Sequence, residues 1–400
     1  MQDAADLVIV GGGPAGMMAG LLFARAGVDT LVLEKHRDFL RDFRGDTVHP
    51  STMEIIDELG LLDAFLARPH QRVSEATVRF GGRDYRIGDL RQLDTPSPFI
   101  AMMPQWEFLD FLLGAACHCP SFTLEREAEV AGFEEEGGRV GGVRLRDGRR
   151  IRARRLVIAA DGRGSAVRRM LPVRTLGAPM DIFWFRVPKA LGGDGLRGVF
   201  DPGRILVLIN RGDYWQCALI FPKGQAEALR ARGIKAIRGE IEAGAPELGD
   251  LSAVLTDTAQ LHLLAVALDR LERWSRPGLL AIGDAAHAMS PIGGIGINLA
   301  IQDAVAAANI LAAPLLAGRD VDTLLKPVER RRLLPTRLVQ AGQKFAQDRV
   351  IGALLTADRP PTPPLALPLL DRFPPLRRLP GRMIGLGIRR EHVRSPATSA

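Results

Sequence analysis

A glycine-rich turn near the start of the chain limits the fold more than any other feature. The turn, Gly11-Gly12-Gly13-Pro14-Ala15-Gly16, follows the apolar run 7–10 and precedes a helical stretch over residues 17–26. A second apolar run, 30–33, ends at Glu34. A strand, a glycine-rich turn, a helix and another strand in this order predict a βαβ unit, whose two strands lie parallel in one sheet.

The spacing within this unit fits the binding of a dinucleotide. Gly11 permits the sharp turn, Gly13 lets a pyrophosphate approach the backbone, and Gly16 allows close packing of the helix on the strand. An acid that ends the second strand, here Glu34, can hydrogen-bond an adenosine ribose. Because all these features agree, we interpret the segment as a dinucleotide site rather than as an ordinary tight turn.

A second glycine-rich segment lies far along the chain, at residues 283–298, and reads GDAAHAMSPIGGIGIN. It follows the apolar run 279–282 and precedes an alanine-rich helical pattern over residues 299–311. A strand-to-helix turn whose amides point outward favours an anion or an electron-rich ring edge. Two such turns, far apart in the sequence, predict one extended cofactor that is held at both ends.

Composition narrows the class of protein. A hydrophobic content of 46% in 400 residues supports one large core or two ordinary ones. The three cysteines, Cys117, Cys119 and Cys217, are odd in number and form no paired pattern, so we expect neither a disulfide framework nor a metal site. This cysteine usage is typical of a reducing cytoplasm, where we expect the protein to act.

Charge and hydropathy exclude further classes. The net charge of +7 comes from scattered arginines without interleaved aromatic residues, so we expect no nucleic-acid partner. No run of about 18 apolar residues occurs, and the first strand begins by residue 7. We therefore expect no signal peptide and no stable membrane insertion.

The pattern of strands predicts an α/β fold with a discontinuous Rossmann-like cofactor domain, an inserted β-sheet substrate domain and a helical C-terminal tail. The β-rich segments, near residues 76–87 and 182–221, carry no glycine-rich cofactor signal. The expected ranges are 1–75, 102–175 and 276–345 for the cofactor domain, 76–101 and 176–275 for the substrate domain, and 346–400 for a tail rich in proline and arginine.

Four motifs occur in a particular order: residues 11–16, Arg44-Gly45, Asp161-Gly162-Arg163-Gly164-Ser165, and residues 283–298. In this order the chain, over residues 5–345, resembles the single-component (group A) FAD-dependent aromatic hydroxylases, the 4-hydroxybenzoate hydroxylase-like flavoprotein monooxygenases. The resemblance implies that FAD is bound in an extended pose. It also implies NAD(P)H as a co-substrate that docks transiently near Arg44 and Asp161, because the chain has no second dinucleotide fingerprint.

The resemblance also implies roles for individual residues. The pyrophosphate would lie near the first turn and Arg44, the adenosine ribose near Glu34 and the ribityl chain near Gln105 and Asp284. The backbone of Val130 would meet the adenine end, and the backbone around Gly296 would meet the flavin pyrimidine edge. The full expected cofactor set is Gly11, Gly13, Ala15, Gly16, Glu34, Lys35, Arg44, Gln105, Val130, Asp161, Asp284, Gly296, Ile297 and Asn298.

The reaction implied by the family is hydroxylation of an aromatic or polyketide-like small molecule with NAD(P)H and O2, through a flavin C4a-hydroperoxide. Pro291 can present a rigid carbonyl and an apolar ring edge above the flavin, because proline has a fixed φ and no amide hydrogen. We expect His49 to be a proton relay or a substrate contact, the alternative being a surface or helix-preceding histidine. His287 is expected to support its loop.

Substrate contacts are expected on the strand 214–221, where at least one of Tyr214 and Trp215 should face the pocket, with Phe183 as a neighbour. The alternative is that these aromatic residues are ordinary sheet core.

Two other enzyme classes use the same scaffold. A flavin-dependent halogenase would show a Trp-x-Trp-x-Ile-Pro signature, which this chain lacks. A reductase of a prenyl or lipid-like substrate is the other alternative, and a flavin-binding protein without activity is the least favoured. The tail is expected to be a helical cap, a homodimer contact, or a contact with an anionic membrane through Arg377, Arg378, Arg389 and Arg390.

Overall fold

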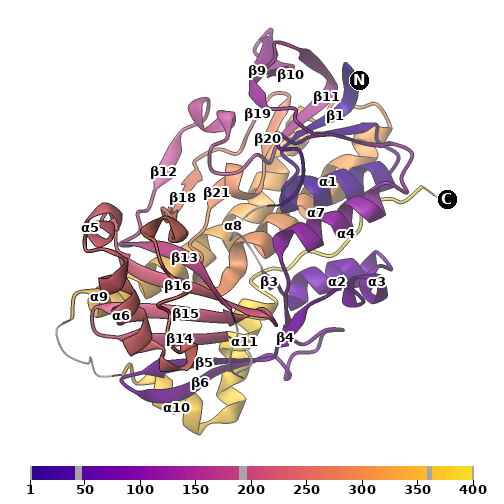
Figure 1. Ribbon diagram of the computed structural model, residues 1–400. Helices are drawn as coiled ribbons and strands as arrows, with labels where there is room; N and C mark the ends of the chain where they lie inside the picture. Colours follow the sequence, from indigo (N-terminus) through magenta and orange to yellow (C-terminus); the bar gives the residue numbers. More distant parts are fainter. Residues whose placement is uncertain (1, 41–46, 189–195, 358–362, 399–400) are drawn as a thin grey trace.

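The computed structural model of the chain describes residues 2–40, 47–188, 196–357 and 363–398 (Figure 1). Its largest sheet confirms the predicted βαβ unit, because residues 7–10 of β1 pair in parallel with residues 30–33 of β2. The spatial order is β19 (Ser275–Arg276), β20 (Leu279–Ala281), β11 (Arg150–Ala159), β1 (Ala4–Val10), β2 (Thr30–Leu33) and β8 (Phe122–Glu125). The five strands from β20 to β8 are parallel, so their carboxyl ends meet at one edge of the sheet.

The same sheet is extended by an antiparallel hairpin, β9 (Val130–Glu136) and β10 (Arg139–Leu145), which pairs with β11. On one face of the sheet lie α1 (Pro14–Arg25), α4 (Gln105–Ala116) and α7 (Ile295–Leu316), and α8 (Asp322–Ala346) packs on α7. The helical segment Ile292–Leu316 is long and apolar enough to cross a membrane, but 72% of its 18-residue apolar stretch is buried in the protein. It is therefore the central helix of this layer, packed between α1 and α8.

A second sheet joins two distant parts of the chain. Its order is β17 (His262–Leu264), β13 (Met180–Pro188), β16 (Tyr214–Pro222), β15 (Arg204–Asn210), β14 (Leu196–Asp201), β5 (Glu75–Phe80) and β6 (Arg83–Asp89). The parallel pairing of β14 with β5 makes the join. The two β-rich segments of the sequence thus form one sheet, beside the cofactor-type sheet (Figure 1).

The two faces of this second sheet are covered differently. The helices α5 (Ala226–Ala231) and α6 (Ile234–Gly244) pack their apolar residues on one face. The other face packs against Ile292, from the second glycine-rich segment, and against α9 (Gly352–Leu355). This second face is therefore the one turned toward the first sheet and its helices, which we name the cofactor-type half.

Two small sheets and two helices connect the halves. One sheet is β3 (Thr47–Val48), β7 (Ile100–Met102) and β4 (Gln71–Val73); the other is β12 (Val173–Thr175), β18 (Asp269–Leu271) and β21 (His287–Ala288). The helices α2 (Pro50–Glu58) and α3 (Leu62–Leu66) follow β3.

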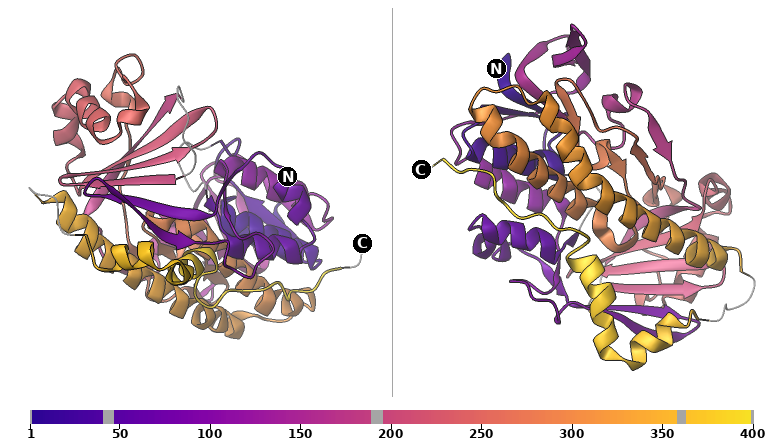
Figure 2. Two further views of the ribbon diagram at one scale, coloured as in Figure 1. Left: turned by 90° about the horizontal axis from the view of Figure 1, so that it is seen from below. Right: turned by 180° about the vertical axis from the view of Figure 1, so that it is seen from behind.

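The C-terminal segment crosses both halves (Figure 2). Its helices α10 (Ala366–Arg372) and α11 (Arg378–Gly385) pack on β6 of the second sheet. The chain then runs in extended form along the first half, where the backbone N–H of Thr398 donates to the carbonyl of Arg25, at the end of α1, at 2.9 Å.

Candidate cofactor and substrate site

The first glycine-rich turn is shaped by its glycines. Gly11 has a φ of +103°, and a Cβ added to it would lie 2.7 Å from the Cα of Asp161. A Cβ on Gly16 would lie 1.9 Å from the carbonyl oxygen of Gly11. Beside Gly13, in contrast, a Cβ would meet no atom of the described residues within 4 Å. The turn is therefore closed on the protein side and open at Gly13, where a ligand can approach the backbone.

Glu34 lies at the end of β2, where the sequence predicts it, and is buried. Its Oε2 accepts a hydrogen bond from the backbone N–H of Gly12 at 2.9 Å, and its Oε1 accepts from the N–H of His36 at 3.0 Å. The carboxylate is thus fixed against the glycine-rich turn. Lys35, the next residue, is exposed.

Asp161 follows β11 and lies directly behind the first turn. The side chain of Ser165 and the backbone of Ala166 lie where they act to lower the pKa of its carboxyl. Its Oδ1 is buried and has no partner in the part of the chain that the structure describes. Burial raises the pKa of this carboxyl, because the charged form is poorly solvated there. A cofactor donor at Oδ1 would relieve that cost.

The second glycine-rich segment reaches the first one. A Cβ added to Gly283 would lie 3.0 Å from the Cβ of Ala15, at the start of α1. Gly293 and Gly294 have positive φ values of +77° and +62°, and a Cβ on Gly294 would lie 2.3 Å from Oγ1 of Thr47. The start of the second segment therefore lies against the first turn, and its later glycines lie beside Thr47.

An arginine that the sequence analysis did not single out joins two of the motifs. Arg163 donates from Nε to Oδ2 of Asp284 at 3.1 Å and from a terminal nitrogen to the carbonyl of Met289 at 3.0 Å. Arg168 donates to the carbonyl oxygen of Asp284 at 3.0 Å. The Asp161-Gly162 motif thus fastens the second glycine-rich segment. The arginines that follow Asp161 in the sequence are the feature from which these contacts could have been predicted.

The helix expected at residues 299–311 begins earlier, at Ile295. Gly296 and Ile297 therefore lie in the first turn of α7, whose N–H groups have no partner inside the helix. The side chain of Asn298 is used within the protein: its Oδ1 accepts from the N–H of His49 at 2.8 Å and from Oγ1 of Thr52 at 2.7 Å. Asn298 holds β3 and α2 against the start of α7.

His49 precedes α2, is fully buried and does not lie on the surface. Its Nδ1 lies 2.7 Å from the carbonyl oxygen of Ile384 in α11, which makes Nδ1 the donor and Nε2 the acceptor. Nε2 has no partner among the described residues. Burial lowers the pKa of His49 to about 4, although the bond to Ile384 acts to raise it. His49 is therefore neutral at neutral pH, with a bare acceptor nitrogen.

Pro291 is half-buried and begins the short 3-10 turn Ile292–Gly294. Its carbonyl accepts from the N–H of Gly294 at 3.1 Å.

Gln105 begins α4, which packs on α1. Val130 begins β9 and packs against the apolar cluster that contains Leu33. Arg44 lies outside the described residues.

His287 supports its loop through a buried charged network. Asp303 in α7 accepts from Nε2 of His287 at 2.6 Å, from the N–H of Gly283 at 3.1 Å and from Nε of Arg332 at 2.9 Å. Burial acts to raise the pKa of Asp303, but His287 and Arg332 hold it below its ordinary value. Arg332 also reaches Glu391 of the C-terminal segment at 3.3 Å.

The expected substrate contacts Phe183 and Trp215 need correction. Both are buried in the cluster that packs against Ile237 and Ile241 of α6. They therefore lie on the face of the second sheet that is turned away from the cofactor-type half, so this placement gives no support to substrate contact. The reading of these residues as ordinary sheet core fits their surroundings.

The opposite face of β13 and β16 carries different residues. Trp184 is half-buried and packs against two apolar clusters, one with Ile182 and one with Met102. Its Nε1 is buried and unpaired among the described residues. Gln216 and Tyr214 share the alternation of this face. The alternation along a strand predicts that Trp184, Tyr214 and Gln216 share one face and Phe183 and Trp215 the other. It is the position of α6 that decides which of these faces is turned toward the cofactor-type half.

Comparison with known proteins agrees with this geometry. A protein family described as FAD binding domain matches residues 4–342. The chain is 33% identical over 405 residues to a 6-methylpretetramide 4-monooxygenase of Streptomyces rimosus, covering 98% of this chain and 94% of that protein. It is 27% identical to an uncharacterized aromatic compound monooxygenase of Bacillus subtilis, covering 75% of this chain but only 60% of that protein.

A solved structure shares the fold. The crystal structure of p-nitrophenol 4-monooxygenase from Pseudomonas putida superposes with a TM-score of 0.77, at 20% sequence identity, and covers 98% of this chain and 100% of that one.

Proposed function

Because the chain belongs to the FAD-dependent monooxygenases that share this FAD-binding domain, we propose that it uses NAD(P)H and O2 to hydroxylate an aromatic or polyketide-like small molecule. The observation that carries the proposal is the contact between the two glycine-rich turns, through Ala15 and Gly283, beside the unpaired Oδ1 of Asp161. Residues 1–75, 102–175 and 276–345 would form the cofactor part, and 76–101 and 176–275 the substrate part.

The residues present fit FAD. Gly13 leaves space for a pyrophosphate, Glu34 is fixed at the end of β2 for a ribose, and Asp161 offers a buried acceptor. The full proposed set is Gly11, Gly13, Ala15, Gly16, Glu34, Lys35, Arg44, Gln105, Val130, Asp161, Asp284, Gly296, Ile297 and Asn298. When bound, FAD supplies the redox chemistry that links NAD(P)H to O2.

The start of α7 contributes electrostatics. The amides around Gly296 and the positive end of this 22-residue helix favour negative charge on the edge of an electron-rich ring. Asn298 fixes that end through His49 and Thr52, so the donors are held in place before any ligand binds. Pro291 lies before the 3-10 turn Ile292–Gly294 that leads into α7, and it would present its ring to the flavin.

We propose that the substrate lies against the face of the second sheet that carries Trp184, Tyr214 and Gln216. His49 would contact a phenolic hydroxyl by accepting a hydrogen bond at its Nε2, since the carbonyl of Ile384 keeps the other nitrogen protonated. Ile384 links His49 to Trp184: its carbonyl oxygen accepts from His49, and its side chain packs against the same apolar cluster as Trp184.

The experiment is a panel of phenolic polycyclic compounds with the FAD-loaded protein. We expect some compounds to stimulate both NAD(P)H oxidation and O2 uptake, with a product heavier by one oxygen atom. NAD(P)H oxidation with a reduced double bond and no O2 uptake would identify a reductase instead. A product that carries a halogen only when halide is added would identify a halogenase.

A further inference from the structure

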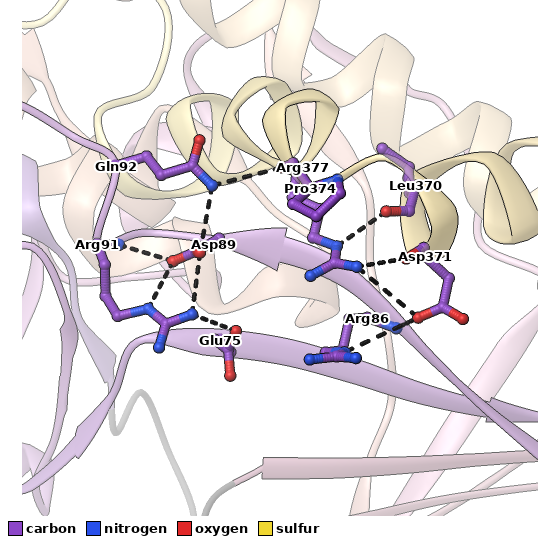
Figure 3. Close-up of polar contacts among 9 residues, drawn as sticks. All are labelled: Glu75, Arg86, Asp89, Arg91, Gln92, Leu370, Asp371, Pro374 and Arg377. Carbon is purple, nitrogen blue, oxygen red and sulfur yellow. Dashed lines mark hydrogen bonds and ion pairs between the residues drawn. The ribbon is translucent and has the colours of Figure 1, made fainter.

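The C-terminal segment 363–386, which we name the strap, is tied to the second sheet by polar contacts on its inner side. Arg377 is buried and donates from Nε to the carbonyl of Leu370 at 2.8 Å and from a terminal nitrogen to the carbonyl of Asp371 (Figure 3). The carboxylate of Asp371 accepts from the N–H of Arg86 on β6 at 3.2 Å. Gln92 donates to the carbonyl of Pro374 at 3.4 Å.

The strap is also held at close range. A Cβ added to Gly381 would lie 2.6 Å from the carbonyl oxygen of Asp89, at the end of β6. Asp89 is itself fixed by Arg91 and Gln92 (Figure 3). The rotation of α11 on the sheet is therefore fixed, so the side chains that point outward do so in the folded protein.

The outward side chains are apolar. Six large hydrophobic residues of the strap are exposed: Leu365, Leu369, Phe373, Leu376, Leu379 and Met383. The exposed fractions reach 91% for Leu365 and 63% for Leu379. Six exposed large apolar side chains within one short segment form a surface that water disfavours, so this face fits a covering partner.

Most of the exposed charge along the strap is positive. Exposed arginines alternate with the apolar residues along the strap and continue onto β6: Arg372, Arg378, Arg382, Arg83 and Arg86. Asp371 is the only carboxylate in the strap, and it lies 3.7 Å from Arg83 and 3.9 Å from Arg86. A second copy of the chain on this face would bring two sets of arginines together, which opposes symmetric pairing.

We propose that the strap binds the surface of an anionic lipid membrane. Its helices have seven and eight residues, too short to span a bilayer but suited to lie in the interface, with leucine and phenylalanine among the acyl chains and arginines at the headgroups. The binding is peripheral and uses the outward face of the strap, whereas Ile384 on the inner face contacts His49 of the proposed substrate site.

The test is co-sedimentation of the full chain, purified with FAD, with vesicles of phosphatidylcholine alone or mixed with phosphatidylglycerol. We expect at least about tenfold stronger binding to the anionic vesicles, weakened by salt. The double variant Leu379→Ser/Met383→Ser should lower binding about tenfold or more. The double variant Arg378→Gln/Arg382→Gln should remove most of the preference for phosphatidylglycerol.

A matched control replaces one exposed leucine and one exposed arginine elsewhere on the surface. Leu316→Ser/Arg319→Gln, at and beyond the end of α7, should bind vesicles as the wild type does. Circular dichroism and thermal melting confirm that each variant is folded. Failure of the wild type to bind anionic vesicles, or equal binding by both strap variants, would overturn the proposal. So would a change from dimer to monomer in the Leu379 variant, since the strap would then pair with a second copy.

Discussion

His49 shows how one residue carries both a stability cost and a proposed role. Its ordinary pKa of 6.5 falls to about 4 on burial. Between these values the unfolded chain binds a proton that the folded chain does not, so the free energy of unfolding falls as the pH falls from 6.5 to 4. The total loss from this group is about 3 kcal/mol.

We therefore predict that His49→Gln makes the free energy of unfolding less dependent on pH between 6.5 and 4, as measured by urea unfolding at several pH values. His118→Gln, at an exposed histidine, is the control and should leave the dependence unchanged. If His49→Gln changed neither this dependence nor turnover and its pH profile, both the buried neutral state and the substrate-contact role would be excluded.

Arg332 is the buried cation that holds Asp303 beneath the second glycine-rich segment. Its removal leaves a buried carboxylate with less compensation, so Arg332→Leu should lower the free energy of unfolding by about 3–5 kcal/mol. The neighbouring Arg330 is exposed, and Arg330→Leu should change it by less than about 0.5 kcal/mol. Chemical unfolding of the two variants side by side measures the difference. Equal effects would show that the network adds nothing to stability.

At the scale of elements, the two glycine-rich turns were predictable because glycine marks positions where a Cβ has no room. Gly11 and Gly283 are such positions. The start of α7 was placed four residues too late, because glycines at 293, 294 and 296 hide the beginning of a helix in the sequence. The orientation of Trp184 and Trp215 was not predictable, since it depends on α6, which lies later in the chain.

Two glycines of the first turn separate folding from cofactor binding. Gly16→Ala places a Cβ against the carbonyl of Gly11 and should destabilise the protein itself. Gly13→Ala meets no protein atom, so it should leave the melting temperature without FAD unchanged but raise the Kd for FAD about tenfold or more. Flavin titration and melting without FAD measure both. Unchanged FAD affinity of Gly13→Ala would contradict the proposed pyrophosphate position.

At the scale of the whole molecule, the second sheet is built from segments far apart in the sequence, and its two faces should differ in function. Trp215→Ala removes a side chain from the core beneath α6 and should lower the free energy of unfolding by about 3–5 kcal/mol. Trp184→Ala should have a smaller effect on stability but raise the KM for the substrate. The reverse pattern would place the substrate on the other face.

The path of the C-terminal segment across both halves of the molecule could not be predicted from the sequence. Its anchors, such as Thr398 on Arg25 and Glu391 on Arg332, join residues that share no local pattern. Proline and arginine content indicated a tail, but only the tertiary contacts show that it reaches His49 through Ile384.

The central claim is that the two glycine-rich turns hold one FAD with which the chain inserts oxygen into an aromatic substrate. Turnover of a stimulating substrate under ¹⁸O2, followed by mass spectrometry of the product, tests it most directly. The account predicts one ¹⁸O atom in the product, dependent on NAD(P)H and FAD. A product whose added oxygen comes from water, or NAD(P)H oxidation that yields only hydrogen peroxide with every substrate, would contradict it.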